Sequence, residues 1–188
     1  MTPNSNLLWS ASANQRAQSN MQAYITWLTE HQMVRCDQTE CFTQHHNLHD
    51  YHQLWHWSTN HIEDFWQSIW QYFQIESSTP YQQVLAERVM PGARWFQGAQ
   101  LNYAQHSLRY ANDQQTAILF KSEGQDTQAI SWAQLRQQVA ALAYQLRQLG
   151  VQRGDRVVAY IPNIPQAVVA MLASTSLGSL FNGDAFRI

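Results

Sequence analysis

Four side chains of the kind that bind zinc lie close together in the sequence: Cys36, Cys41, His45 and His49. Zinc sites in proteins commonly use four thiolate, imidazole or carboxylate ligands at about 2.0–2.3 Å from the metal. Two histidines four positions apart lie on the same face of a helix, a spacing that the pairs His45/His49 and His52/His56 both have. The chain therefore contains the donor atoms that a zinc site requires.

The spacing of the two cysteines argues against such a site. Zinc knuckles hold the metal with cysteines separated by a tight two-residue loop, whereas four residues separate Cys36 from Cys41 and no second pair follows. We therefore favour solvated surface histidines, and a zinc site stays the alternative. Two cysteines are also too few for a disulfide framework.

Aromatic side chains gather between residues 55 and 73 and form a second candidate for binding chemistry. They are Trp55, Trp57, Phe65, Trp66, Trp70, Tyr72 and Phe73. A surface on which bases stack needs exposed rings with cations beside them, and only Arg88 and Arg94 follow within thirty residues. The net charge of −2 gives no electrostatic reason to expect a nucleic acid or an anionic membrane as partner. We therefore expect these rings to pack in a core.

Side chains for phosphate chemistry are scarce. Lys121 is the only lysine, so the chain has no Gly-Lys-Ser/Thr phosphate-binding loop. Gly150 and Gly154 are expected to end a helix and to turn the chain into a strand, rather than to cradle a phosphate. No residue of this chain is predicted to be catalytic or to bind a cofactor or a metal.

The stretch from Ser131 to Gly178 is expected to organise the chain. Apolar residues at helical spacing follow Ser131, namely Leu135, Val139, Leu142, Leu146 and Leu149. Ser131 and Gln134 suit a capping box, and Gly150 suits the left-handed residue that ends a helix. The apolar, β-branched run from Val157 to Ile161 predicts a buried strand. These elements predict the opening of a layered α/β domain.

The run from Ile164 to Leu177 is apolar on nearly every side, which is typical of a helix inside a larger structure. Only ten residues follow Gly178, so we expect this α/β unit to be the start of a domain whose remainder is missing. In the alternative, the aromatic side chains nearer the N-terminus cover this helix and close one compact domain.

Further elements are expected before this unit. Apolar spacing predicts a helix that contains Met21, Tyr24, Ile25 and Leu28 and a second helix that starts at Asn60. Then come a short linker at Ser77–Pro80, a fixed extended connector at Met90–Ala104, a helix that begins near Leu101, and a β-hairpin of Thr116–Phe120 with Gln128–Trp132. No apolar run reaches the roughly 18 residues of a membrane span, and the N-terminus lacks a signal core, so we expect a cytoplasmic protein.

Three stretches resemble the N-terminal part of the adenylate-forming acyl-CoA synthetases, and most closely their acetoacetate branch. The first is Leu54–Ser58 with Phe65, Trp66 and Trp70, which looks like the N-terminal region of acetyl-CoA-synthetase-type enzymes. The second is Met90–Phe96 with Leu101–Ala104, which looks like the connector of the acetoacetate branch. The third lies between Ile130 and Asn163 and resembles the opening of the nucleotide-binding large domain.

The resemblance implies both a fold and a reaction. The fold is α/β, with a helical, aromatic-rich N-terminal cap followed by the first strands and helices of an adenylate-forming large domain. The implied domains are an N-terminal extension (1–48), the acetyl-CoA-synthetase-type region (49–104) and the start of the AMP-binding domain (105–188). The implied reaction joins acetoacetate to AMP with Mg-ATP, releases pyrophosphate, and transfers the acyl group to coenzyme A.

The same resemblance implies that the phosphate loop, the ribose-binding aspartate and the catalytic lysine of the family lie beyond Gly178. From Ser179 to Ile188 the sequence departs from the family pattern. We therefore expect a fragment, or the product of a shifted reading frame, without activity of its own. Two other hypotheses stay open. The chain is an independent interaction module, or it complements a separately encoded remainder of the ligase.

Overall fold

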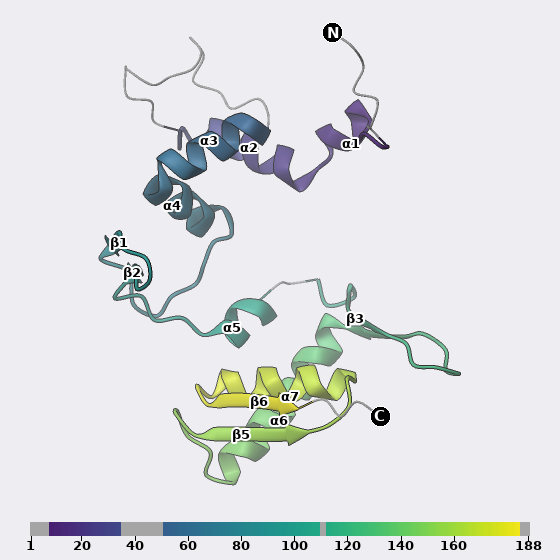
Figure 1. The fold of residues 1–188 in the computed structure, drawn as a ribbon. Helices are drawn as coiled ribbons and strands as arrows, with labels where there is room; N and C mark the ends of the chain where they lie inside the picture. Colours follow the sequence, from purple (N-terminus) through teal and green to yellow (C-terminus); the bar gives the residue numbers. More distant parts are fainter. Residues whose placement is uncertain (1–7, 35–50, 110–111, 185–188) are drawn as a thin grey trace. The chain divides into compact units, whose positions relative to one another are not determined.

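A computed structural model describes residues 8–34, 51–109 and 112–184 of the chain (Figure 1). The chain divides into two compact units, which we call the first unit (Met1–Ile75 with Tyr81–Gly98) and the second unit (Glu76–Pro80 with Ala99–Ile188). The predicted α/β class is confirmed, since helices precede and then alternate with strands. No helix within the described ranges is long and apolar enough to cross a bilayer.

Helices make up most of the first unit. They are α1 (Ala13–Ala17), α2 (Asn20–Glu30), α3 (Tyr51–Asn60) and α4 (Ile62–Tyr72). The predicted helix that contains Met21 and Leu28 is confirmed as α2, which begins after the side-chain cap of Ser19. Its residues Tyr24, Ile25 and Leu28 are buried, as their spacing predicts.

Two predictions for the first unit are wrong in detail. The helix expected to start at Asn60 starts at Ile62 as α4, after His61. Asn60 is the last residue of the preceding helix α3. The connector expected to be merely extended contains a strand of a hairpin, in which β1 (Gln83–Glu87) pairs antiparallel with β2 (Arg94–Gln97). The turn between the strands includes Gly92, whose φ of 108° suits glycine.

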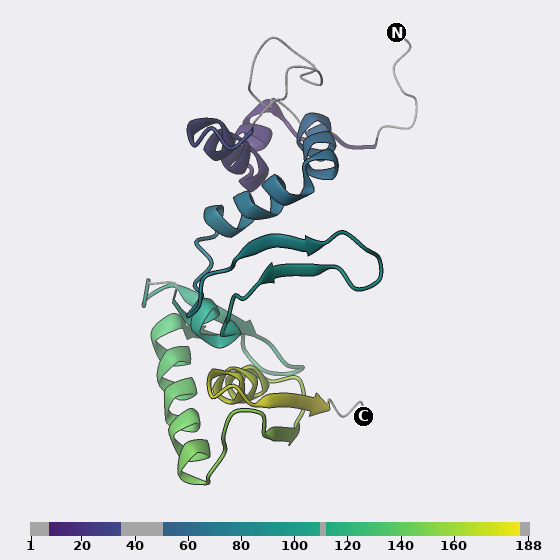
Figure 2. The same cartoon turned by 90° about the vertical axis from the view of Figure 1, so that its left-hand side faces the viewer.

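The second unit continues the chain with one short helix, a hairpin and an alternation of helices with strands (Figure 2). Its elements are α5 (Tyr103–Leu108), β3 (Thr116–Phe120), β4 (Gln128–Ser131), α6 (Trp132–Gln148), β5 (Arg156–Tyr160), α7 (Pro165–Ser176) and β6 (Leu180–Asp184). β3 and β4 pair antiparallel, which confirms the predicted hairpin, and β5 and β6 pair in parallel. α7 packs against α6 and also contacts β5 and β6.

The ends of α6 follow the predicted chemistry. Ser131 and Gln134 form the capping box, with each side chain bonded to the backbone N–H of the other residue. At the other end, the N–H of Val151 donates to the carbonyl of Leu146 at 3.0 Å, while Gly150 has a φ of 90°. This is the predicted Schellman close, and it directs the chain toward β5.

The core of the second unit is aliphatic. It consists of Ala104, Leu135, Val139, Val169, Leu172 and Ala173, with Leu142, Leu146 and Met171 among the partly buried residues around it. The apolar helix Ile164–Leu177, which we expected to leave for a missing remainder to cover, is covered within the described residues. Gln166 is the only exposed residue of α7, and α5, α6, β5 and β6 all contact this helix. Exposed apolar side chains lie on β5 and not on α7. Val158 and Tyr160 of β5 are 71% and 69% exposed.

These exposures correct two further predictions. β5 is not buried on both faces, because its burial alternates and only Val157 and Ala159 of the strand are partly covered. Leu149 does not belong to the apolar stripe of α6, since it lies one residue beyond the last turn and is 81% exposed.

Candidate functional site

The candidate ligand site is the carboxyl edge of the β5–β6 pair, by which we mean Tyr160–Gln166 with the end of β6. The parallel register from Arg156↔Leu180 to Tyr160↔Asp184 brings the ends of both strands to one edge. α7 begins at the same edge, with Pro165 in its first turn and no side-chain cap. In open α/β sheets, ligands bind in the crevice outside the carboxyl ends of the strands.

The chemistry available at the carboxyl edge is hydrogen bonding. The residues from Tyr160 to Gln166 carry no ionised side chain at neutral pH. The first N–H groups of a helix lack intrahelical partners and carry partial positive charge, which suits an anionic or polar ligand. The exposed amides of Asn163 and Gln166 supply further donors and acceptors. The residues Tyr160–Gln166 can hold a polar group, but they supply no carboxylate, imidazole, amine or thiol. The end of β6 adds Asp184 to this edge.

The opposite edge of the same pair is closed by backbone bonds. The N–H of Gly154 donates to the carbonyl of Gly178 at 3.0 Å, and the N–H of Leu180 donates to the carbonyl of Asp155 at 2.7 Å. Gly154 has a φ of 91°, which allows the turn into β5. Gly150 and Gly154 therefore have the structural roles that the sequence predicts, and neither N–H group is left for a phosphate.

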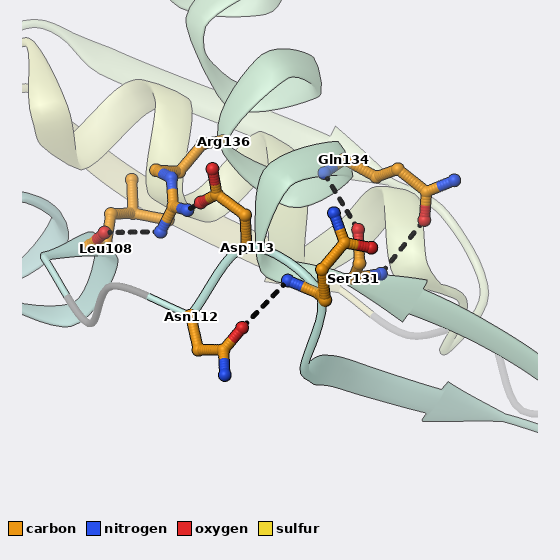
Figure 3. Close-up of polar contacts among 7 residues, drawn as sticks. Leu108, Asn112, Asp113, Ser131, Gln134 and Arg136 are labelled. Carbon is orange, nitrogen blue, oxygen red and sulfur yellow. Dashed lines mark hydrogen bonds and ion pairs between the residues drawn. The ribbon is translucent and has the colours of Figure 1, made fainter.

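An arginine holds the segment before β3 against the start of α6 (Figure 3). The guanidinium of Arg136 forms an ion pair with Asp113 and donates to the backbone carbonyl of Leu108 at 3.2 Å. The carbonyl of Asp113 also accepts from the N–H of Ala133 at 3.3 Å. These contacts join α5, the segment before the hairpin and α6.

The structure tests only part of the hypothesis of a zinc site. Cys36, Cys41, His45 and His49 lie outside the described residues, so a site made by them stays a hypothesis. Within the described ranges, no group of three or more His, Cys, Asp or Glu side chains could hold a metal ion. His52 and His56 are exposed on α3, and the ring of His56 bonds the amide of Asn60 at 2.9 Å.

The aromatic side chains pair with one another, but the expectation that they pack in a core holds only in part. Trp57 is buried and Phe65, Trp70 and Tyr72 are partly buried, whereas Trp55, Trp66 and Phe73 are exposed. The ring centroids of Trp70 lie 4.6 Å from those of Phe96 and 5.1 Å from those of Tyr81. Trp57 and Phe65 meet edge to face at 5.9 Å. These distances are typical of aromatic pairs in cores.

Two described groups have displaced pKa values, and neither lies at the carboxyl edge. Burial raises the pKa of the Tyr24 hydroxyl in α2, partly offset by its hydrogen bond to Ser68. Burial lowers the pKa of His106 in α5, and the charge of Arg109 acts in the same direction while Glu76 opposes it. Lys121, the only lysine, is exposed after β3.

One polar residue that sequence analysis missed joins two helices of the second unit. Asn102 caps α5 and also bonds two carbonyls at the end of α7. An asparagine just before an apolar run is a recognisable cap signal. The bonds to residues more than seventy positions away leave no local pattern, so the sequence offered no signal for them.

Two family profiles match the chain in succession. The profile described as the acetyl-coenzyme A synthetase N-terminus matches residues 51–107, and the profile described as AMP-binding enzyme matches residues 106–182. The carboxyl edge lies in the second matched region, and Asn102 lies in the first.

Individual proteins similar to this chain carry related names. Acetoacetyl-CoA synthetase from Rattus norvegicus is 38% identical over 141 residues, which are 73% of this chain and 21% of the relative. A malonamoyl-CoA synthetase from Penicillium aethiopicum is 36% identical over 143 residues, or 72% of this chain and 20% of the relative. The chain thus spans about a fifth of the length of these curated relatives.

A solved structure extends the similarity to nearly the whole chain. The acetoacetyl-CoA synthetase from Streptomyces lividans has a TM-score of 0.81 and 40% sequence identity, and the match covers 94% of this chain and 26% of that protein. At this level of identity the likeness concerns sequence as well as fold.

Proposed function

Because the chain belongs to the adenylate-forming acyl-CoA synthetase family and matches the N-terminal part of acetoacetyl-CoA synthetases, we propose that it is the N-terminal part of an ATP-dependent acetoacetate–CoA ligase. The observation that carries this proposal is the match to the Streptomyces lividans enzyme over 94% of the chain. The domain division at residues 1–48, 49–104 and 105–188 is part of the same proposal.

The proposed reaction has two steps. In the first, a carboxylate oxygen of acetoacetate attacks the α-phosphorus of ATP, and pyrophosphate leaves as acetoacetyl-AMP forms. In the second, the thiol of coenzyme A attacks the acyl carbon, and AMP leaves with the electron pair of the broken C–O bond. Both steps develop charge on phosphate oxygens, which cations and preorganised donors stabilise.

The described residues do not fit a complete Mg-ATP site. No group of three or more His, Cys, Asp or Glu side chains that could hold a metal ion occurs among them, and the residues Tyr160–Gln166 of the carboxyl edge carry no ionised side chain. We therefore assign no step of adenylation to the described residues. Their proposed contribution is the scaffold of α5, α6, α7 and the β5–β6 pair, and we propose that the 188-residue chain alone is inactive.

The names of the relatives suggest a substrate class. Acetoacetate and malonamate are both short acids with a second carbonyl one methylene away from the carboxylate, and they differ in a terminal methyl or amino group. We propose acetoacetate as the acid for this ligase, with malonamate as the nearest competitor. Acetate, which lacks the second carbonyl, is the matched control. We also propose that the ligase works in the cytoplasm, without a nucleic acid or membrane partner.

A chimera tests the proposal. Residues 1–182 of this chain would replace the matching stretch of the Streptomyces lividans enzyme, and acetoacetyl-CoA formation and pyrophosphate release would be measured. We expect the chimera to form acetoacetyl-CoA at more than a tenth of the rate of the parent enzyme, and the 188-residue chain to form none. A folded but inactive chimera, or acetoacetyl-CoA made by the chain alone, would contradict the proposal.

The exposed face of the β5–β6 pair supports a second candidate, in which the chain complements a separate ligase chain. Val158, Tyr160 and Leu180 are 71%, 69% and 58% exposed on this pair, whereas parallel strands are normally covered on both faces. We expect mixing with the remaining part of the Streptomyces lividans enzyme to restore activity under this candidate. A Val158→Asp variant should then lose the restored activity, and an independent interaction module would show none in either case.

A further inference from the structure

The side chain of Asn102 joins the beginning of one helix to the end of another. Its Oδ1 accepts a hydrogen bond from the N–H of Gln105 at 3.0 Å and so caps α5. Its Nδ2 donates to the carbonyl oxygens of Thr175 at 3.1 Å and of Ser176 at 3.2 Å, the last two residues of α7. One partly buried amide therefore satisfies backbone groups of two helices that are over seventy residues apart.

These bonds belong to a set that fixes the C-terminal end of α7. The hydroxyl of Ser179 donates to the carbonyl of Ser174 at 2.7 Å, and the N–H of Gly154 holds the carbonyl of Gly178 at 3.0 Å. The last four carbonyls of a helix have no intrahelical partner, and donors near them also favour the negative end of the helix dipole. Asn102 is the member of this set that comes from α5.

The other end of α7 has no side-chain cap. Ile164 precedes the helix and makes no side-chain cap bond, so the first turn is held by the buried Pro165 and by backbone bonds from Ile164 to Pro162 at 2.8 Å and from Ala167 to Ile164 at 2.9 Å. This end lies at the carboxyl edge of the β5–β6 pair. A helix of 12 residues is about 18 Å long. A tilt of only a few degrees about the C-terminal anchor therefore moves the N-terminal end by about 1 Å.

We propose that Asn102 is a positioning residue that sets the placement of α7, and through it the carboxyl edge, in the AMP-binding region. Its effect on activity rests on the proposed ligase function, whereas its effect on α7 does not. A displacement of about 1 Å at a reacting site can cost on the order of 100-fold in rate. The amide of Asn102 thus connects the region matched as acetyl-coenzyme A synthetase N-terminus to the region matched as AMP-binding enzyme.

Three substitutions separate this role from simple capping of α5. Asn102→Ser keeps an oxygen that accepts from the N–H of Gln105 but loses the donor to α7. Asn102→Asp keeps the cap and turns a carboxylate toward the carbonyls of Thr175 and Ser176. Asn102→Ala loses both functions. Ser131→Ala is the matched control, because Ser131 caps α6 through the N–H of Gln134 and bonds no second helix.

Amide hydrogen exchange on the 188-residue chain measures the C-terminal end of α7 and the first turn of α5 independently. At Leu177, Gly178 and Ser179 we expect exchange about tenfold faster with serine or alanine, and faster still with aspartate, since two hydrogen bonds are lost or reversed. At Gln105 we expect faster exchange only with alanine. General destabilisation would accelerate exchange at both helix ends in the same order of variants, so it would not produce this difference. Ser131→Ala should leave Leu177–Ser179 unchanged.

The kinetic test uses the active chimera described above. We expect Asn102→Ser to lower kcat about tenfold or more while KM for ATP and acetoacetate changes less than threefold. Unchanged exchange at Leu177–Ser179, or the same acceleration everywhere, would overturn the proposal. Altered exchange at Leu177–Ser179 with unchanged kcat would overturn the claim that Asn102 affects the reaction by placing the carboxyl edge. If the unsubstituted chimera is inactive, the proposed function fails, and hydrogen exchange alone decides the placement of α7.

Discussion

The two units of this chain are held together by different kinds of side chain. The first unit is packed with rings, since Tyr24, Leu28 and Trp57 are surrounded by Trp27, Phe65, Ile69 and Tyr72. The second unit is packed with small and branched aliphatic side chains on α5, α6 and α7. Ala104 of α5 and Ala173 of α7 are both fully buried, which lets these helices approach each other closely.

The difference shows in how each unit treats polar groups. Large rings bring hydroxyl and indole groups into the core, where they need partners. The first unit accordingly pairs the hydroxyl of Tyr24 with that of Ser68 at 2.5 Å. The aliphatic second unit uses Asn102 at its helix ends instead. The first unit therefore adds a buried side-chain polar pair to its helix caps, of which Ser19 on α2 is one, while the indole N–H of Trp57 has no hydrogen-bond partner among the described residues.

The largest effects should come from removing core volume in each unit. Leu28→Ala in α2 and Leu172→Ala in α7 each truncate a side chain that is 0% or 4% exposed. We expect each to lower the free energy of unfolding by about 2–5 kcal/mol. Seven of the eight tryptophans precede residue 99, and Trp132 is the eighth, so tryptophan fluorescence reports mainly on the first unit.

Denaturant unfolding followed by fluorescence and by far-UV circular dichroism then tests whether the units are distinct. Leu28→Ala should move the unfolding transition seen by fluorescence to lower denaturant concentration. Leu172→Ala should leave that transition in place and move to lower denaturant concentration the unfolding of the second unit, which is seen only by dichroism. Coincident shifts of both signals in both variants would show that the two cores unfold as one.

The second prediction concerns the polar pair of the aromatic core. Ser68→Ala leaves the hydroxyl of Tyr24 without the partner that it has at 2.5 Å. We expect a loss of about 1–3 kcal/mol, the cost of an unsatisfied buried polar group. Tyr24→Phe should cost less, because the hydroxyl of Ser68 still donates to the carbonyl of Phe65 at 2.7 Å.

A double-mutant cycle by chemical denaturation checks this prediction. The double variant should be no less stable than Ser68→Ala alone, since the orphaned hydroxyl is gone. Additive losses from the two substitutions would mean that the pair contributes nothing to the specificity of the first unit.

Sequence patterns predicted what is local in both units. The capping box of Ser131, the Schellman close at Gly150 and the buried face of α2 follow from residues within a few positions of one another. The family resemblance is confirmed by the two matched profiles and by the Streptomyces lividans structure.

What the sequence did not predict depends on contacts between distant segments. The exposure of Val158 depends on what covers β5, and the pairing of β1 with β2 depends on where two strands meet. The bond from Asn102 to Thr175 joins residues that no short pattern relates.

The third prediction is a loss of stability of the first unit in alkali. The pKa of Tyr24 is raised, chiefly by burial, above its ordinary value of 10.0. Between pH 10 and the raised pKa, the unfolded state has lost the proton that the folded state keeps, so stability falls as pH rises. Hydrogen exchange in residues 20–30 should accelerate above pH 10 beyond the intrinsic base dependence, and Tyr24→Phe should remove this extra acceleration. Its persistence in that variant would exclude Tyr24 as the cause.

The fourth prediction is a loss of stability of the second unit in acid. The pKa of His106 is lowered below 6.5 by burial and by Arg109, against the opposing charge of Glu76. As pH falls through 6.5, the unfolded state binds a proton that the folded state resists, so stability decreases. Denaturation between pH 5 and pH 8 should show this slope, and His106→Phe should flatten it. If His106→Phe leaves the slope unchanged, the loss of stability in acid comes from carboxylates and not from His106.

The smallest effect is expected at Ser174 of α7, the counterpart of Ser68 in the other unit. Both side chains are 0% exposed, but among the described residues the hydroxyl of Ser174 has no hydrogen-bond partner. Burying a hydroxyl without a partner costs free energy, so its removal relieves a cost instead of creating one. We expect Ser174→Ala to be neutral or to stabilise the chain slightly, by less than about 1 kcal/mol, in the denaturation assay that shows a loss for Ser68→Ala. A loss as large as that of Ser68→Ala would reveal a partner for Ser174, and the two cores would then treat buried hydroxyls alike.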